Sequence, residues 1–379
     1  MYHDACSAQK SVSPAARPLR AGTRLSRLGA VLLGVACALA SGGVSAAQSD
    51  LALGVYYFPG WRADTPAAPS SKPWQPIEPY PERKPLLGWY DEGEDDVMRL
   101  QLDWMIQYGL KFVVFDWYWG KDNRVYLDHA LSAYFRSPQK TQLPFSILWA
   151  NHGDVPTSQA NFERMVDWWV KYYASRPEFL RVDGKPVVFV FSALDLAERA
   201  KGFGSSTRQL LAGAQQRARD AGLPGFYFVA GVTGDTPDLL RDAKAMGYSA
   251  VSAYNLHAPA GQQAKLSYSY KDLSAAYQSH WRQYASVSSV PAILPLTAGW
   301  DRRPWGGTYD PKHDQCMPTL DEFKSHLSDG RKAMEALKQT GPKLGVVCCW
   351  NEFGEGSFIE PTAKQGKARL ERVLEVFGR

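Results

Sequence analysis

The sequence lacks the signatures of several common enzyme classes. It has no glycine-rich phosphate loop after a strand, no G-x-S-x-G nucleophile turn and no nicotinamide-binding fingerprint. No spacing of cysteine and histidine suggests a zinc site, so neither a metal nor another cofactor is expected. A Ser-His-Asp hydrolase stays open on composition, but nothing in the sequence points to its nucleophile. These absences disfavour nucleotide-dependent and zinc-dependent chemistry.

Long apolar runs are also missing. The run at residues 28–40 has 13 residues, which is too short to span a membrane comfortably. Four arginines precede it and Val44-Ser45-Ala46 follows, which is the layout of a secretory signal. We therefore predict a signal peptide over residues 1–47 and an exported chain, periplasmic or secreted, over residues 48–379. No stable membrane insertion is expected after cleavage.

Strong charge and abundant cysteine are absent from the predicted mature chain. Residues 1–46 carry +4 of the formal net charge of +5, which leaves about +1. This balance gives no reason to expect nucleic acid as a partner, and nothing indicates an oligomeric state. Neighbouring strand residues point to opposite faces, so Cys348 and Cys349 are expected to be packing residues rather than a vicinal disulfide. A bridge from Cys316 to either one stays open.

What the chain does have is a regular alternation of short apolar runs and longer amphipathic ones. The runs expected to be strands are 53–58, 112–117, 144–149, 186–191, 226–232, 250–254, 292–297 and 344–350. The stretches expected to be helices are 94–108, 124–135, 158–174, 206–221, 238–246, 273–284, 320–339 and 363–377. Buried strands that alternate with helices in this way predict a single α/β domain, a parallel (β/α)₈ TIM barrel.

Polar and aromatic residues gather where the predicted strands end, which is the catalytic end of such a barrel. Aromatics make up 13% of the chain, and those at strand ends would suit stacking on sugar rings. Any one of them alone is better explained as core packing, and only their shared location suggests a site. For Asp116 a structural hydrogen bond is an equal alternative, and His152 alone decides nothing. The predicted carbohydrate-binding residues are Tyr56, Tyr57, Asp116, Trp117, Trp149, Asn151, His152, Tyr254, Trp300, Asp301 and Asn351.

The most informative feature is a pair of glutamates at the end of the last apolar run. Glu352 and Glu355 are three residues apart and are flanked by Trp350 and Phe353. A pair of carboxyl groups is the minimum equipment for cleaving a glycosidic bond. Placed together at a dry site, they push one pKa upward and leave an acid beside a base. The alternative is a salt bridge or a helix N-cap. Glu360 is a weaker third candidate, since it could simply start the terminal helix.

Several segments together resemble glycoside hydrolase family 99 and its WbsX-like relatives. The segments are VYYFPGW at 55–61, GWYD at 88–91, LWAN at 148–151, LRVDGKP at 180–186 and WNEFGEG at 350–356. The resemblance spans residues 53–362 and implies a (β/α)₈ barrel related to retaining endo-α-mannosidases. It also implies that Glu352 takes the proton of the sugar 2-hydroxyl to form a 1,2-anhydro sugar, and that Glu355 is the acid/base.

Two departures from the family's pattern concern the surroundings of the glutamates. The endo-mannosidases usually have Trp and then His between the two acids, where this chain has Phe353 and Gly354. The relatives often carry an acid at the position of His152. The expected function is therefore an exported, metal-independent hydrolase of an α-linked poly- or oligosaccharide, with the sugar left open. The alternatives are a glycosyltransferase or transglycosylase in polysaccharide biosynthesis, and a non-catalytic glycan-binding barrel.

Overall fold

The structure of the protein is a computed structural model that describes residues 51–63, 72–234, 236–262 and 265–378. The predicted signal peptide lies outside these residues. Within the described ranges, no helix combines the length and the apolar character needed to cross a bilayer.

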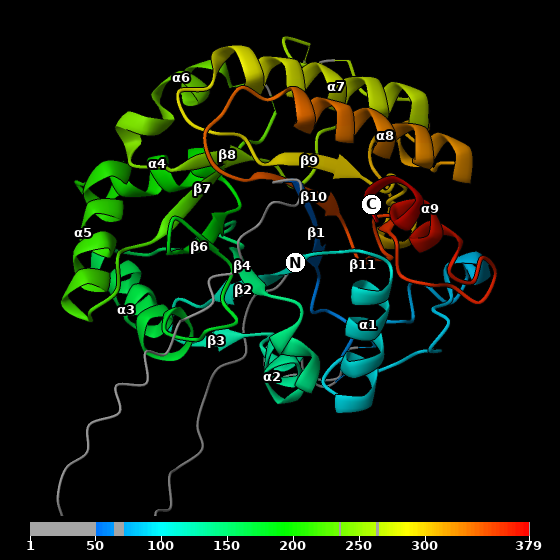
Figure 1. The fold of residues 1–379 in the computed structure, drawn as a ribbon, viewed down its shortest axis with the longest axis horizontal. Coiled ribbons are helices and arrows are strands. Elements are labelled where there is room, and N and C mark those ends of the chain that lie inside the picture. Colours follow the sequence, from blue (N-terminus) through cyan, green and yellow to red (C-terminus); the bar gives the residue numbers. More distant parts are fainter. Residues whose placement is uncertain (1–50, 64–71, 235, 263–264, 379) are drawn as a thin grey trace, which may run out of the picture. The chain divides into compact units, whose positions relative to one another are not determined.

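Eight parallel strands form the centre of the molecule, and helices surround them (Figure 1). The strands are β1 (Leu51–Tyr57), β2 (Phe112–Trp119), β4 (Phe145–Trp149), β6 (Lys185–Val190), β7 (Tyr227–Gly231), β8 (Ala250–Ser252), β9 (Leu294–Thr297) and β10 (Lys343–Cys348). Their order is β8-β7-β6-β4-β2-β1-β10-β9. A parallel bridge between Val251 and Ala292 joins the two ends of this order. The predicted TIM barrel is confirmed.

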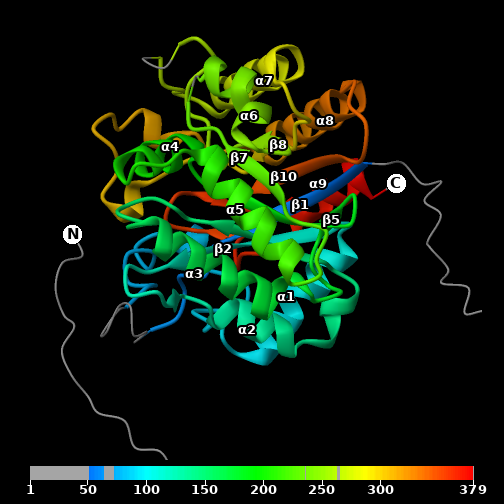
Figure 2. The same ribbon diagram turned by 90° about the vertical axis from the view of Figure 1, so that its left-hand side faces the viewer.

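The helices lie outside the strands, and α3, α4 and α5 cover the side turned to the viewer in Figure 2. The α-helices of the described residues are α1 (Asp95–Gln107), α2 (His129–Arg136), α3 (Gln159–Trp169), α4 (Ala193–Gly202), α5 (Thr207–Asp220), α6 (Pro237–Met246), α7 (Tyr270–Val287), α8 (Leu320–Ala336) and α9 (Ala368–Phe377). Every stretch predicted to be helical overlaps one of these helices. Each connects one parallel strand to the next or follows the last strand, as the barrel requires.

Three helix predictions need correction. The stretch 124–135 begins with β3 (Val125–Tyr126), which pairs antiparallel with the end of β2, so α2 starts only at His129. The terminal helix begins at Ala368 rather than at 363. Helix α4 was not predicted. Its start has a local cause, because the backbone N–H of Asp195 donates a hydrogen bond to Oγ of Ser192 at 3.1 Å and caps the helix.

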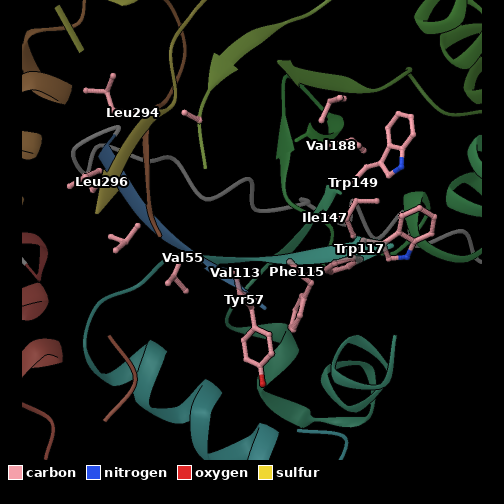
Figure 3. Close-up of a cluster of buried hydrophobic side chains, with 14 of the residues drawn as sticks. Val55, Tyr57, Val113, Phe115, Trp117, Ile147, Trp149, Val188, Leu294 and Leu296 are labelled. Atoms are coloured by element: carbon pink, nitrogen blue, oxygen red, sulfur yellow. The ribbon is translucent and has the colours of Figure 1, made fainter. Parts of the chain in front are cut away.

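Alternate strand residues face the barrel interior and the surrounding helices. One buried cluster contains only residues of the strands and the segments beside them, with Tyr56, Val114 and Leu148 among its members. A second cluster combines strand residues such as Val55 and Val113 with residues of the helices, and Figure 3 shows part of it. The first cluster fills the barrel, and the second lies between sheet and helices. Even positions of β1 and β2 therefore point inward, and odd positions point outward.

The two neighbouring cysteines depart from the expectation. Cys348 and Cys349 are joined by a disulfide, and both belong to the cluster that fills the barrel. The expectation assumed that the strand alternation continues through both residues. In the structure β10 ends at Cys348, so the alternation does not reach Cys349. Cys316 is a free, buried cysteine, and its thiol lies 3.3 Å from the carbonyl oxygen of Ser267.

Candidate active site

The two glutamates predicted to be catalytic lie on a short hairpin that follows β10. Its strands β11 (Asn351–Glu352) and β12 (Ser357–Phe358) are antiparallel, with Glu352 opposite Ser357. In the turn between them, the backbone N–H of Glu355 donates to the carbonyl oxygen of Glu352 at 3.2 Å. The turn therefore holds both glutamates together at the carboxyl end of the barrel strands, where catalysis takes place in this fold.

Packing fixes the residues between the two acids. Phe353 is fully buried in a cluster with Trp61 and Trp74. A Cβ at Gly354 would lie only 2.0 Å from the ring of Trp305, so the indole occupies the space that a side chain would need. The departure from the Trp-His pattern of the endo-mannosidases therefore has a structural counterpart in this chain. Phe353 packs into the core, and Gly354 makes room for Trp305.

Two consecutive residues after β8 hold one glutamate each. The hydroxyl of Tyr254 lies 2.9 Å from Oε1 of Glu352. The side-chain amide of Asn255 donates to Oε2 of Glu355 at 3.1 Å. Because Tyr254 and Asn255 are adjacent in the chain, their two hydrogen bonds bring the carboxyl groups to the same side of the barrel mouth. Glu355 is partly exposed, and Glu352 is 4% exposed.

A third carboxyl group joins the same hydrogen-bond cluster. Asp116 occupies an inward position near the end of β2, and its Oδ2 lies 2.9 Å from the hydroxyl of Tyr254. The ring of Tyr254 contacts that of Tyr56, with a centroid separation of 4.9 Å. Oδ1 of Asp116 and Oε2 of Glu352 are buried without a hydrogen-bond partner among the described residues. Burying a carboxyl oxygen without a hydrogen bond costs free energy, so these oxygens are suited to accept a hydrogen bond from a ligand.

Burial raises the pKa of all three carboxyl groups. It raises the pKa of Glu355 to about 7, while the charge of Arg302 and the hydrogen bond from Asn255 oppose the rise. Burial also raises the pKa of Glu352 well above its usual range, and the negative charges of Glu355 and Asp116 add to this effect. The pKa of Asp116 is raised by burial and by Glu355. A carboxyl group that titrates near neutral pH can act as an acid or as a base.

Three of the aromatics predicted to contact sugar lie elsewhere. Tyr57, Trp117 and Trp149 belong to the cluster between sheet and helices, and Figure 3 shows them together with the outward residues of their strands. The hydroxyl of Tyr57 donates to Gln101 of α1 at 2.7 Å, and the indoles of Trp117 and Trp149 pack on Trp169 of α3. This corrects the expectation. The three residues occupy odd positions, which point away from the barrel interior.

Three polar residues that were predicted to contact sugar bind other parts of the protein. The side chain of Asn151 exchanges two hydrogen bonds of 2.8 Å with the backbone of Ser192. Asn351 exchanges two of 2.9 Å with the backbone of Phe58. The carboxylate of Asp301 forms a buried ion pair of 2.6 Å with Arg83. These side chains use their polar atoms within the protein, and their assignment as sugar contacts stays a prediction.

Arg83 connects Asp301 to the hairpin that carries Glu352 and Glu355. Its guanidinium donates to the carbonyl oxygen of Asp301 at 2.9 Å and to that of Phe353 at 2.7 Å. The backbone N–H of Asp301 in turn donates to the carbonyl oxygen of Glu355 at 2.6 Å. The buried arginine therefore fixes the turn that carries both glutamates.

The remaining predicted residues lie on or beside the carboxyl-group cluster. Tyr56 is inside the barrel, against the ring of Tyr254. His152 is exposed and contacts the ring of Tyr118, with a centroid separation of 6.0 Å. Trp300 is buried and packs on the ring of His257, with a centroid separation of 4.1 Å. His257 lies two residues after Asn255 in the chain. Tyr56 and Trp300 are thus both buried and packed within the protein, whereas His152 is exposed beside the cluster.

Three residues beside the acids were not among the predicted site residues. Asn255 binds Glu355 directly, Arg302 lowers the pKa of Glu355, and the negative charges of Asp116, Glu352 and Glu355 act on Tyr118. A sequence signal existed for each of them. Each of the three residues lies next to a predicted sugar-binding residue at the end of a predicted strand. Tyr118 follows Trp117, Asn255 follows Tyr254, and Arg302 follows Asp301. Their proximity to the glutamates depends on barrel closure, which no local pattern reports.

Comparisons with known proteins agree with this architecture. The family described as "Glycosyltransferase WbsX" matches residues 58–373. A protein of Xanthomonas campestris pv. campestris named "Uncharacterized protein WxcX" is 25% identical over 318 residues, covering 77% of this chain and 43% of that protein. The chain thus spans less than half the length of this curated relative.

Two solved structures share the fold. The GH99 endo-alpha-mannosidase from Bacteroides thetaiotaomicron, in complex with BIS-TRIS-propane, has a TM-score of 0.59 at 18% identity, covering 86% of this chain and 97% of that one. A structure titled "Glycoside hydrolase-like protein" has a TM-score of 0.61 at 14% identity, covering 87% and 94%. At these identities the likeness concerns the fold alone. The family match covers most of the chain, and the protein belongs to the family described as Glycosyltransferase WbsX.

Proposed function

We propose that the protein is an exported glycoside hydrolase that cleaves an α-linked poly- or oligosaccharide with retention of configuration. The observation that carries the proposal is the pair of glutamates held by Tyr254 and Asn255. One of them, Glu352, has a carboxyl oxygen without a partner in the described part of the chain, and the pKa of the other, Glu355, is raised to about 7. One group is thus suited to accept a proton from a ligand, and the other holds a proton near neutral pH.

In the proposed reaction the substrate supplies its own nucleophile. Glu352 takes the proton of the 2-hydroxyl group while the 2-oxygen forms a bond to C1. The bond from C1 to the leaving oxygen breaks, and Glu355 gives its proton to that oxygen. In the second step Glu355 takes a proton from water and the water oxygen attacks C1. The bond between C1 and the 2-oxygen breaks, and Glu352 returns its proton to the 2-oxygen. Two inversions at C1 give net retention.

The second candidate is glycosyl transfer, which the description of the family favours. The same carboxyl groups would then deliver the glycosyl unit to a sugar hydroxyl group instead of water. A transferase that uses a nucleotide sugar also needs a diphosphate site and a donor, which is usually cytoplasmic. The predicted signal peptide and the absence of a phosphate-binding motif favour the hydrolase.

Digestion of a glycan panel without any nucleotide tests the proposal. The panel contains α-mannans and bacterial exopolysaccharides, with Glu355→Gln as the inactive reference and Glu360→Gln as the matched control outside the site. Shorter products are expected from the wild type and from Glu360→Gln, and early NMR spectra should show the retained anomer. Products that appear only with a nucleotide sugar would support the transferase. Glycan binding that is equal in all variants, without cleavage, would identify a binding barrel.

A further inference from the structure

The hydroxyl group of Tyr254 lies between two carboxyl groups. It is 2.9 Å from Oδ2 of Asp116 and 2.9 Å from Oε1 of Glu352. A tyrosine hydroxyl carries one proton, so it donates one full hydrogen bond and accepts the other. Two hydrogen bonds at this distance therefore require a second proton, which must come from one of the two carboxyl groups. The geometry assigns one shared proton to Asp116 and Glu352.

Burial makes the doubly ionised state unfavourable. Asp116 is 5% exposed and Glu352 is 4% exposed. One oxygen of each group is already buried without a partner among the described residues. Two unpaired negative charges next to each other in a dry environment cannot both persist at neutral pH, and the pair then titrates as a unit. A single proton on the pair removes one of the charges.

Among the described residues, the groups found to act on Asp116 and Glu352 do not supply a compensating positive charge. Tyr56 faces Asp116 from β1, and Tyr118 lies two residues beyond Asp116 on β2. Glu355 acts on both carboxyl groups from the hairpin turn. The cation in this region, Arg302, acts on Glu355. The neighbours that act on Asp116 and Glu352 are thus negative or neutral.

We propose that Asp116 carries the shared proton in the resting protein and keeps Glu352 ionised through Tyr254. The O–H of Asp116 donates to the oxygen of Tyr254, and the O–H of Tyr254 donates to Oε1 of Glu352. Oε2 of Glu352 is then free to accept the proton of the sugar 2-hydroxyl group. This inference rests on the proposed function, because only a base needs an ionised Glu352. Asp116 keeps its own proton throughout, so it is a positioning residue.

The proposal separates two substitutions of Asp116. Asp116→Asn retains a donor for the oxygen of Tyr254 and imitates the protonated acid, so kcat should fall by no more than about 10-fold. Asp116→Leu has no donor and leaves the Tyr254 hydroxyl free to reorient, so kcat should fall by about 100-fold or more, within the range of a lost proton-transfer partner. The low-pH limb of the activity profile should stay in place in Asp116→Asn. An equal loss in both variants, with folding intact, would overturn the assignment.

An infrared measurement tests the proton itself and needs no substrate. The carbonyl stretch of protonated carboxylic acids is recorded at neutral pH for the wild type, Asp116→Asn, Tyr254→Phe and Glu360→Gln. Asp116→Asn should remove one band and Tyr254→Phe should shift it. Glu360→Gln should remove a different band, because burial raises the pKa of Glu360 to about 8. A spectrum of Asp116→Asn that keeps every band of the wild type would refute the shared proton.

The two measurements also distinguish this inference from the proposed function. If the infrared band of the shared proton is observed but no glycan is cleaved, the proton assignment is supported and the proposed hydrolase function is contradicted. If a glycan is cleaved but the band is not observed, the hydrolase function is supported and the shared proton is contradicted.

Discussion

Two buried hydrogen-bond clusters in this protein both contain carboxyl groups with a raised pKa, but they differ in how the carboxyl oxygens are used. The mouth cluster comprises Asp116, Tyr254, Asn255, Glu352 and Glu355. The support network comprises Tyr57, Tyr90, Gln101 and Glu360. In the support network both oxygens of Glu360 accept hydrogen bonds, from Tyr90 at 2.7 Å and from Gln101 at 3.1 Å. In the mouth cluster an oxygen of Asp116 and an oxygen of Glu352 accept no hydrogen bond from the residues that the structure describes.

Under the proposed function, the comparison means that a raised pKa alone does not distinguish the acid from a structural carboxyl group. Burial raises the pKa of Glu360 to about 8 and that of Glu355 to about 7, so the two glutamates shift in the same direction for the same reason. Glu360 is 1% exposed and its hydrogen-bonding capacity is used within the protein, whereas Glu355 is partly exposed. Under the proposed function, the partial exposure of Glu355 is what separates it from the buried Glu360.

The largest expected difference between the two groups is in catalysis. Glu355→Gln should lower kcat by about 100-fold to 10,000-fold, because a general acid contributes that much to the departure of a poor leaving group. Glu360→Gln should leave kcat within a few-fold of the wild type. Both are measured by release of reducing ends from the glycan identified in the panel.

A change of leaving group sharpens this first prediction. An aryl glycoside with an acidic leaving group needs little protonation, so the loss in Glu355→Gln should shrink markedly with such a substrate. An equal loss with both leaving groups would contradict the role of Glu355 as the acid, and a large loss in Glu360→Gln would end the contrast between the two groups.

The second expected difference concerns stability against pH. The pKa of Glu360 is raised in the folded protein to about 8, from its ordinary value of 4.5. The folded state therefore binds this proton more tightly than the unfolded state, and the contribution of Glu360 to the free energy of unfolding falls as the pH rises from 4.5 to about 8. The fall is at most about 1.4 kcal/mol per pH unit. Urea denaturation of Glu360→Gln should show a shallower decline over this range, and an unchanged slope would contradict the shift.

A smaller effect, on stability alone, is expected when the hydrogen-bond donor to Glu360 is removed. Tyr90→Phe removes the hydroxyl that serves Oε2 of Glu360 and leaves a buried oxygen unsatisfied. The free energy of unfolding should fall by about 1–3 kcal/mol, with kcat unchanged. Denaturant unfolding and the glycan assay are measured on the same preparation. If kcat fell with stability intact, the support network would belong to the reactive site, and the comparison would fail.

Much of the fold followed from local patterns in the sequence. Apolar runs of five to seven residues alternate with amphipathic stretches, and each predicted strand lies at a barrel strand of the structure. The positions of Glu352 and Glu355 at the end of the last such run also followed from the chain alone. Helix α4 was missed because its start depends on one capping side chain, Ser192.

The orientation of side chains at strand ends was harder to predict. The alternation of inward and outward residues places Asp116 inside the barrel and Trp117 outside, and this rule would have excluded Tyr57, Trp117 and Trp149 once one inward position was known. Asn351 could not be judged in this way, because its partner, Phe58, is 293 residues away in the sequence. Partners of this kind become visible only when the barrel closes.

The smallest predicted effect concerns the balance of charge at Glu355. The exposed Arg302 lowers the pKa of Glu355, and burial raises it, with a net value of about 7. Arg302→Gln removes the positive charge, so the pKa should rise and the high-pH limb of kcat should move to higher pH. A shift of less than about one pH unit is expected, because solvent screens an exposed charge. The matched control is Arg303→Gln, whose guanidinium pairs with Asp301, not with Glu355. A limb that moves to lower pH, or that moves equally in the control, would show that Arg302 does not set the proton affinity of the acid. In that case the difference between the mouth cluster and the support network would rest on the unused oxygens alone.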